Sequence, residues 1–244
     1  MNISRSLKSF FERKRYWYFL PKKIRFMIFN IKILKKYQTK TGQYYLPFFA
    51  FKDGIRNKII NNEITDEVVF KKVQDFIKPN SIVLDLGANF GQMSILWSKC
   101  KPDIEVYAFE ASKYVFNILK KNIQINSANV KPFNVLIGNE SNKNQLIKKS
   151  QLNQYTTYGT NKIEACSDQD DKKNIDTIEA LKIDDLNFNK QISVMKIDVQ
   201  GYDLDALKGS EKTIKEHKMP IIFEYEKKFE EEFKYTFQDF EKFI

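Results

Sequence analysis

The sequence has few cysteines and no long apolar run. Only Cys100 and Cys166 occur in 244 residues, and neither stands in a spacing typical of metal ligands. Two cysteines cannot build a disulfide framework, so the composition excludes a small disulfide-stabilised domain and favours a reducing, cytoplasmic setting. No stretch approaches the ~20 apolar residues that cross a bilayer, and no signal-peptide pattern occurs. At this length the chain is expected to fold around a full hydrophobic core.

Arginine is also scarce, with five residues against 36 lysines, although the net charge is +10. The charge is concentrated at the start: residues 1–40 hold 12 basic residues and one acid, whereas residues 41–244 carry a net charge of −1. Arginine is the side chain best suited to bidentate recognition of phosphate and guanine. A nearly neutral body with one arginine has no electrostatic footprint for nucleic acid, so we expect no nucleic-acid partner.

The basic start interleaves aromatic residues with lysine and arginine, and Pro21 divides it. We expect residues 1–45 to form an N-terminal helical extension and residues 46–244 to form the main domain. A basic, aromatic segment of this kind suits the anionic surface at the inner face of a membrane. The alternative is a helical extension that packs on the main domain or on a partner, with its charges solvated.

Beyond residue 60, segments with the periodicity of helices alternate with apolar segments typical of strands. Strands are predicted at 82–86, 105–110, 130–138, 192–199 and 220–225. Helices are predicted at 63–77, 91–100, 113–126 and 203–217, with a last helix that begins near Phe237. This alternation indicates an α/β fold, with a mostly parallel sheet covered by helices on both faces. A polar insertion, residues 139–176, is expected to be a flexible loop or a hairpin.

The stretch "SIVLDLGANFGQ" combines a strand, a glycine turn and the start of a helix, with the spacing Asp85, Gly87, Asn89, Gly91. A dinucleotide-binding oxidoreductase needs the pattern G-x-G-x-x-G, whose glycines let the backbone approach a pyrophosphate. A carboxylate at the end of the strand would repel a pyrophosphate but suits a cationic ligand such as S-adenosylmethionine. Glu110, at the tip of the next strand, is placed to accept hydrogen bonds from both ribose hydroxyls.

Two segments, "VLDLGANFGQMSILW" and "VMKIDVQGYDLDALKGS", together resemble the FkbM-type family of S-adenosylmethionine-dependent methyltransferases. The family motifs are D-x-G-A-N-x-G and K-x-D-V-E-G-x-E, and the resemblance extends over about residues 63–226. It implies a Rossmann-like class I methyltransferase fold. Gln200 and Asp203 stand where the family usually has glutamates. The chain stops inside the helix after the fifth strand, so we expect the C-terminal hairpin of this fold to be absent and the domain to be truncated.

The resemblance implies a site for S-adenosylmethionine at the carboxyl ends of the strands. The expected cofactor-binding residues are Asp85, Gly87, Ala88, Asn89, Gly91, Glu110, Ala111 and Asn139. Asn139 stands where the family commonly has an aspartate near the adenine.

Three residues near the ends of the later strands are candidate catalytic residues. Asp198 ends one strand, Glu224 lies near the end of the next, and Lys196 shares a strand face with Asp198. Lys196 would orient Asp198 or help to take the proton of an acceptor hydroxyl. Two carboxylates can hold a divalent metal, but no third ligand is evident, so we do not expect one. His217, at the other edge of the sheet, is expected only to stabilise the end of a helix.

The resemblance implies O-methylation, commonly of sugars or of natural-product scaffolds. We therefore expect methylation of a hydroxyl on a sugar or nucleotide-sugar destined for a surface polysaccharide. Two alternatives stay open. The first is a methyltransferase that acts on RNA or protein, against which the neutral body and the absence of an N/D-P-P-Y segment argue. The second is a catalytically inactive nucleotide-sugar-binding module, which Gln200 leaves open.

Overall fold

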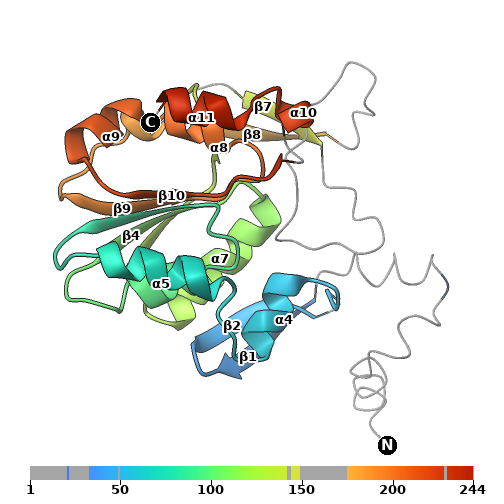
Figure 1. Ribbon diagram of the computed structural model, residues 1–244. Helices are drawn as coiled ribbons and strands as arrows, with labels where there is room; N and C mark the ends of the chain where they lie inside the picture. The colour runs from blue at the N-terminus through green and yellow to red at the C-terminus, as the bar shows by residue number, and fades with distance from the viewer. Residues whose placement is uncertain are drawn as a thin grey trace, which may run out of the picture.

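The computed structural model describes residues 21, 33–48, 50–141, 144–148, 175–227 and 230–243. Its centre is a five-stranded sheet in the order β10-β9-β3-β4-β5, in which all neighbouring strands are parallel (Figure 1). The strands are β3 (Ile82–Leu86), β4 (Glu105–Phe109), β5 (Val130–Phe133), β9 (Ile192–Ile197) and β10 (Ile221–Phe223). The predicted parallel α/β sheet is therefore confirmed.

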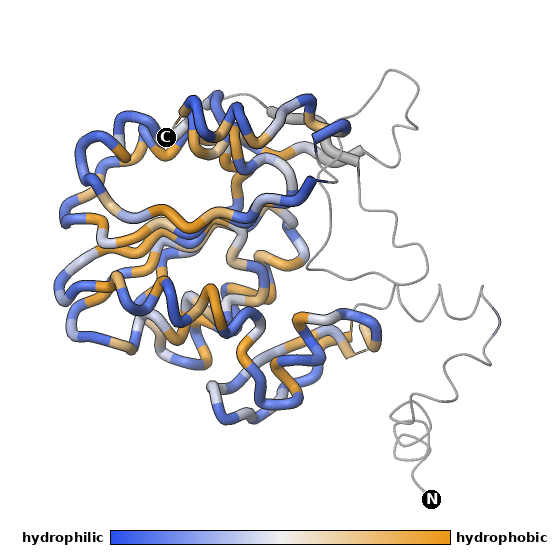
Figure 2. Tube along the Cα trace, in the orientation of Figure 1, coloured by the Kyte–Doolittle hydropathy of each residue, from blue (hydrophilic) through white to orange (hydrophobic). Residues whose placement is uncertain are grey.

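Helices cover both faces of this sheet (Figure 1). One face carries α5 (Glu67–Phe76), α6 (Gln92–Trp97) and α7 (Lys113–Ile125). The other face carries α8 (Asp203–Lys208), α9 (Glu211–His217), α10 (Glu230–Phe233) and α11 (Phe237–Phe243). The apolar residues gather in the strands and on the inner sides of these helices (Figure 2). Each helical layer thus closes its own hydrophobic core against one face of the sheet.

Strand β3 shows how the sequence builds these two cores. All five of its residues are buried, which is typical of a parallel strand covered on both faces. Val83 packs in the core that contains α5, α6 and α7, whereas Leu84 packs in the opposite core. Because side chains alternate along a strand, Asp85 points into the same layer as Val83. This parity places the acid of the glycine motif beneath α6.

The N-terminal segment differs from the prediction. Strands β1 (Leu34–Thr39) and β2 (Gly42–Pro47) form an antiparallel hairpin, so the helical extension predicted over residues 1–45 is wrong for residues 34–45. Tyrosines and threonines suit strands, and Gly42 takes a φ of +139°, which favours glycine at the end of the tight turn. The predicted boundary between residues 45 and 46 falls inside β2. The remaining predicted extension, apart from Pro21 and Ile33, lies outside the described residues.

A short helix that the sequence reading did not predict, α4 (Gly54–Ile60), follows the hairpin. Its N-cap is Asp53, whose buried carboxylate accepts a hydrogen bond from the Arg56 amide at 2.7 Å. The Arg56 side chain is also buried and donates to the backbone carbonyl of Pro47 at the end of β2. These bonds tie α4 to the hairpin.

A second small sheet frames the polar insertion. It has the order β6-β8-β7, where β6 is Leu136–Ile137, β7 is Asn144–Lys148 and β8 is Ile175–Leu181. β7 and β8 are antiparallel, which matches the hairpin alternative for the insertion, and residues 149–174 lie outside the described residues. The sequence reading did not predict β8. A short 3₁₀ helix, Ile183–Asp185, leads from β8 towards β9.

The helix predicted at 203–217 is divided into α8 and α9. A Cβ atom on Gly209, at the division, would lie 1.9 Å from the carbonyl oxygen of Gly138. The close approach of the chain after β6 therefore requires glycine between these two helices. Among the helices that the structure describes, none is long and apolar enough to cross a membrane.

Candidate functional site

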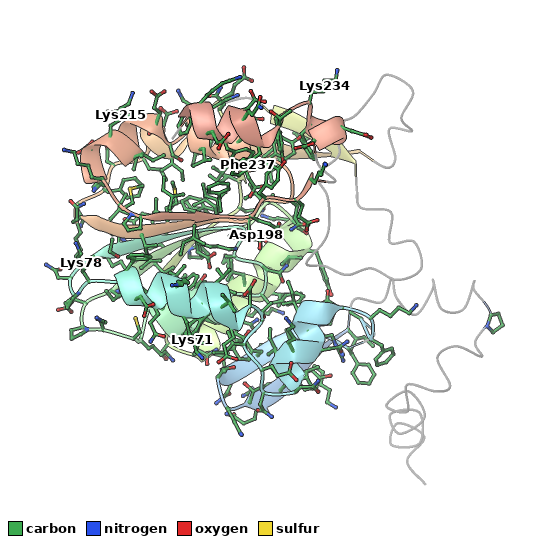
Figure 3. All side chains as sticks on the ribbon, viewed as in Figure 1. Lys71, Lys78, Asp198, Lys215, Lys234 and Phe237 are labelled. Carbon is green, nitrogen blue, oxygen red and sulfur yellow. The ribbon has the colours of Figure 1, made fainter. Side chains whose placement is uncertain are left out.

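The predicted site residues that follow the strands gather at one edge of the sheet. In a parallel sheet all carboxyl ends lie on the same edge, and the turns after β3, β4, β9 and β10 meet there. Figure 3 places Asp198 at this edge, whereas Lys78 and Lys215 lie at the opposite end of the molecule. The candidate site is therefore built from turns that four neighbouring strands hold in place.

The glycine turn after β3 depends on left-handed backbone conformations. Gly87 and Gly91 both have a φ of +84°, and Asn89 between them has a φ of +51°. The amides of Gly87 and Ala88 both donate to the carbonyl of Phe109 at 2.9 Å, which joins the turn to the end of β4. Glycine accepts such φ values at no steric cost and asparagine tolerates them better than most residues.

Glu110 lies directly beneath this turn. One of its carboxylate oxygens accepts from the Asn89 amide at 3.0 Å, and the other accepts from the Ser112 amide at 2.8 Å. Burial raises the pKa of Glu110 to about 7, although both amide donors favour the charged form. A carboxylate has about four acceptor positions, so each oxygen keeps capacity for a further donor. Glu110 can thus accept hydrogen bonds from a diol while it supports the turn.

Asp85 and Lys196 form a buried ion pair. They are direct neighbours in the register of β3 and β9, and 3.5 Å separates Asp85 Oδ1 from Lys196 Nζ. The other carboxylate oxygen of Asp85 accepts from the hydroxyl of Ser94 on α6. Asp85 is 1% exposed, so its side chain faces Ser94 and Lys196 rather than open surface. In this structure Asp85 therefore contacts other groups of the protein, and a direct contact of Asp85 with a ligand stays a prediction.

Lys196 connects the two sequence motifs. Its ammonium group lies 3.5 Å from Asp198 Oδ2 and donates to the Gly87 carbonyl at 3.1 Å. Burial opposes its charge, but the carboxylates of Asp198 and Asp85 outweigh this effect and raise the pKa of Lys196 above its ordinary value. Lys196 therefore stays protonated and is unsuited to take a proton. Its contacts fit the other predicted role, which is to orient Asp198.

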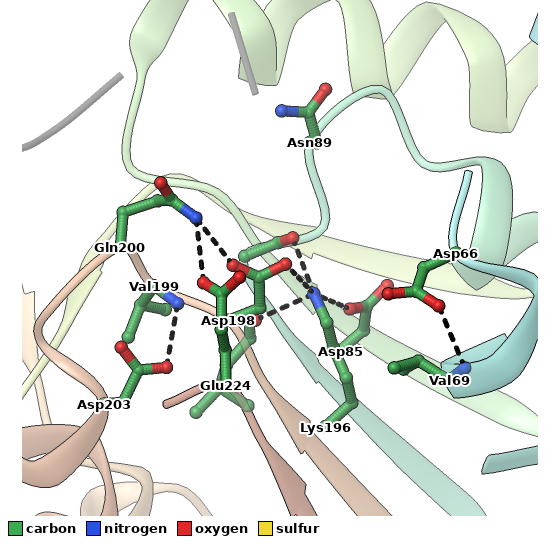
Figure 4. A network of polar contacts seen from close by, with 12 residues as sticks. Asp66, Val69, Asp85, Asn89, Lys196, Asp198, Val199, Gln200, Asp203 and Glu224 are labelled. Atoms are coloured by element: carbon green, nitrogen blue, oxygen red, sulfur yellow. Dashed lines mark hydrogen bonds and ion pairs between the residues drawn. The ribbon is translucent and has the colours of Figure 1, made fainter. Parts of the chain in front are cut away.

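Asp198, Gln200 and Glu224 form a bridged carboxylate pair (Figure 4). The Gln200 amide nitrogen lies 2.9 Å from Asp198 Oδ1 and 3.1 Å from Glu224 Oε2 and donates to both. Burial favours the neutral form of Asp198, but the Lys196 charge and the Gln200 bond outweigh it and lower the pKa of Asp198. Burial and the nearby Asp198 charge instead raise the pKa of Glu224 to about 8. Of the two, Glu224 binds a proton near neutral pH.

Asp203 shapes the loop that carries Gln200. Its carboxylate accepts from the amides of Gly201 at 3.0 Å and Val199 at 3.3 Å. Gln200 has a φ of +54° and Gly201 a φ of +103°, so these bonds hold a tight left-handed turn. Burial raises the pKa of Asp203 to about 6 despite both donors. An acid with a short side chain suits this role, because its carboxylate bonds to backbone amides only two and four residues earlier in the chain.

The structure thus brings together nearly all the predicted site residues. The glycine turn, Glu110 and Ala111 lie at the ends of β3 and β4, beside Lys196, Asp198 and Glu224. Asn139 differs, because it is exposed and its backbone lies against Gly209 at the α8–α9 junction. Its predicted role near an adenine stays a prediction.

Sequence reasoning missed two contacts in this network. Ser94 follows Asp85 in the same strand–turn–helix unit. It lies in the first turn of α6, where its hydroxyl donates a hydrogen bond to the Asp85 carboxylate. Gln200 drew notice only as a departure from a family motif, whereas the structure shows it holding two carboxylates. Within the described part of the chain, no three His, Cys, Asp or Glu side chains are grouped as metal ligands.

Several solved structures are similar to part or most of this chain. An FkbM methyltransferase from Methylobacillus flagellatus KT has 16% identity over 81% of this chain and 46% of its own, with a TM-score of 0.40. TYW2 from M. jannaschii, solved with AdoMet, has 21% identity over 45% of this chain and 52% of its own, with a TM-score of 0.31. Precorrin-6y C5,15-methyltransferase from Geobacter metallireducens GS-15 has 21% identity over 30% of this chain and 41% of its own, with a TM-score of 0.28.

This chain therefore spans about half or less of the length of these three proteins. No curated protein matches it. The methyltransferase FkbM domain family matches residues 85–244, which contain both motifs and every predicted site residue. The five-stranded parallel sheet with helices on both faces is the Rossmann-like arrangement of class I methyltransferases. The chain belongs to the FkbM methyltransferase family.

Proposed function

We propose that this chain is an S-adenosylmethionine-dependent O-methyltransferase that acts on a hydroxyl of a sugar or nucleotide-sugar. The observation that carries the proposal is the bridged pair of Asp198 and Glu224 beside the glycine turn. The pair offers a proton acceptor next to the place where the cofactor would bind. Methyl transfer needs both the cofactor that the glycine turn would bind and the proton acceptor that the carboxylate pair offers, so the proposal depends on the two together.

The residues around the turn fit S-adenosylmethionine. Glu110 keeps free acceptor positions for a ribose diol, and Gly87, Ala88 and Gly91 present backbone without large side chains. When bound, S-adenosylmethionine supplies a methyl group on a positively charged sulfur. Asp198 is ionised and half-buried, so its charge favours a cationic group in its vicinity.

Glu224 is the best candidate to take the proton of the acceptor hydroxyl. A general base works best when its pKa lies near the working pH, and burial and Asp198 raise the pKa of Glu224 to about 8. Asp198, with its lowered pKa, is a weaker base, and Lys196 keeps its proton. As the methyl group would exchange its carbon–sulfur bond for a carbon–oxygen bond, leaving S-adenosylhomocysteine, the hydroxyl proton would pass to Glu224. Gln200 would hold Glu224 and Asp198 in place during this step.

A sugar acceptor is supported by the family resemblance and by the charge pattern. The body of the chain is nearly neutral, which disfavours the RNA alternative, whereas residues 1–40 carry a net charge of +11. A cationic segment would suit the phosphates of a nucleotide-sugar or a lipid-linked glycan. The second candidate, an inactive sugar-binding module, is kept open by Gln200, and it predicts no methyl transfer.

We expect the wild-type rate to rise with pH, because Glu224 must be ionised to accept a proton. At saturating S-adenosylmethionine, kcat/KM for sugar acceptors should rise about tenfold between pH 7 and pH 9 for a base with a pKa near 8. The Glu224→Gln variant should be about 10²–10⁴-fold slower than the wild type, and its residual rate should not increase between pH 7 and pH 9. Release of S-adenosylhomocysteine in the presence of a nucleotide-sugar panel is the measurement.

The matched control is Glu216→Gln, which removes an exposed acid on α9, far from the pair. This variant should keep the wild-type rate and pH profile. No turnover with any sugar acceptor would favour the inactive module. A Glu224→Gln variant with wild-type activity would exclude Glu224 as the base.

A further inference from the structure

The N-terminal hairpin docks on α7 through two asparagines one helical turn apart. Asn122 accepts from the Tyr45 amide at 2.7 Å and donates to the Tyr45 carbonyl at 3.3 Å. Asn126 does the same with Gln43, at 3.0 Å and 2.6 Å. A side-chain amide has the donor and acceptor of a peptide group, so the two asparagines act as a neighbouring strand for β2. Figure 1 shows β2 beside α7.

Asn122 also reaches the glycine turn. Its amide nitrogen donates to the Phe90 carbonyl at 2.9 Å, and Phe90 stands between Asn89 and Gly91. Asn126 donates instead to the Asn122 carbonyl within α7, at 2.8 Å. Of these two asparagines, Asn122 is thus the one whose side chain bonds to both the hairpin and the turn.

Gln92 makes a second link, from the residue that follows the turn. Its side-chain oxygen accepts from the amide and the hydroxyl of Thr65, at 2.9 Å and 2.7 Å. Its amide nitrogen donates to the Glu63 carbonyl at 2.8 Å and to the Thr41 hydroxyl at 3.2 Å. These four bonds use both donors and both acceptor positions of the side chain. Gln92 therefore joins the start of α6 to the hairpin turn and to the segment after α4.

Both amides are almost completely removed from water, with Asn122 0% and Gln92 3% exposed. A buried polar group that loses its partner carries the full cost of desolvation, so the hairpin cannot leave without exposing unpaired groups at the turn. The family match begins at residue 85. The two links therefore join a segment outside the matched region to the motif inside it.

We propose that Asn122 and Gln92 are positioning residues, through which the docked segment 41–65 holds the glycine turn in its cofactor-binding conformation. This inference rests on the proposed use of the turn for S-adenosylmethionine. Coupling between two sites is reciprocal, so docking of the hairpin strengthens cofactor binding, and a bound cofactor protects the hairpin.

Asn122→Ala and Asn126→Ala form a matched pair for the test, because each removes two bonds to β2 and only the first removes a bond to the turn. Calorimetric titration with S-adenosylhomocysteine should show a loss of affinity of at least about fivefold for Asn122→Ala and little change for Asn126→Ala. The thermal midpoints of both variants should fall, since both lose buried hydrogen bonds. Equal affinities in the two variants would overturn the proposal.

Hydrogen exchange separates this proposal from the proposed function. Without any cofactor, the amides of Asn89, Phe90 and Gly91 should exchange faster in Asn122→Ala than in Asn126→Ala or the wild type. If the wild type does not bind S-adenosylhomocysteine, the proposed function fails, and this exchange pattern still decides whether Asn122 positions the turn. If Asn122→Ala does not fold, Gln92→Glu replaces it, because it keeps the acceptor for Thr65 and loses both donors. Unchanged exchange at the turn in the folded variant would overturn the proposal.

Discussion

Replacement of Lys196 with methionine is expected to lower the free energy of unfolding by about 3–5 kcal/mol. Asp85 is 1% exposed, and the Lys196 charge 3.5 Å away is its ionic partner. Among the described residues its Oδ1 has no hydrogen-bond partner, so the ion pair with Lys196 is what compensates the burial of this oxygen. Methionine fills a similar volume without the charge and would leave a buried, unpaired carboxylate. Denaturant unfolding of the wild type and the variant measures the difference.

Two further variants identify the cause. The double variant Lys196→Met with Asp85→Asn should recover much of the lost stability, because it removes the carboxylate that Lys196→Met alone leaves unpaired. Lys215→Met breaks an exposed pair with Glu211 and should cost no more than about 0.5 kcal/mol. A Lys196→Met variant as stable as Lys215→Met would show that the buried pair contributes no net stability.

Gly87→Ala is expected to destabilise the protein by at least about 2 kcal/mol and to abolish binding of S-adenosylhomocysteine. Gly87 has a φ of +84°, which alanine adopts only with strain. The added Cβ would also lie 1.8 Å from the carbonyl oxygen of Asp198, so the turns after β3 and β9 would have to separate. Because the two turns carry the two motifs, the same change disrupts both halves of the site.

Gly54→Ala is the matched control. Gly54 begins α4 with an ordinary negative φ, and a Cβ there would meet no atom within 4 Å. Alanine is a better helix former than glycine, so this variant should be as stable as the wild type or more stable by about 0.4–1 kcal/mol. Thermal unfolding and calorimetric titration of both variants would measure the contrast. Equal behaviour of the two alanine variants would show that the approach of the turn to Asp198 is not needed.

The parallel sheet and the placement of the site were predictable because they depend on local patterns. The apolar stretch around Asp85 and the following glycines define a strand and a turn without knowledge of the rest of the chain. The carboxyl ends of parallel strands share one edge, so Glu110, Asp198 and Glu224 were expected near that turn. The structure confirms this arrangement, whereas the role of each residue towards a cofactor stays a prediction.

The contacts that were not predictable join residues far apart in the chain. Asn122 pairs with Tyr45 across 77 positions, and nothing near either residue in the sequence signals the other. Strand β1 was included in a predicted helical extension because basic and aromatic residues mask its alternation, and tertiary packing decides such segments. The burial of Asp85 follows from the parity of β3 and from the register with Lys196, which a single sequence does not show.

The membrane contact predicted for residues 1–40 also stays a prediction, because most of that segment lies outside the described residues. The structure does show where such a segment would end. Strand β1 begins at Leu34 and belongs to the docked hairpin. A test that removes the basic start should therefore stop before residue 33, so that the hairpin and its bonds to α7 stay in place.

The most direct test of the central claim is calorimetric titration of the wild type and Glu110→Gln with S-adenosylhomocysteine at pH 6 and pH 8. The wild type should bind in the micromolar range, about −8 kcal/mol. The pKa of Glu110 is about 7 and the charged carboxylate accepts the ribose hydroxyls, so affinity should be about tenfold higher at pH 8. Glu110→Gln should bind more weakly and without this pH dependence. Absence of binding by the wild type, or equal binding by both proteins at both pH values, would contradict the account.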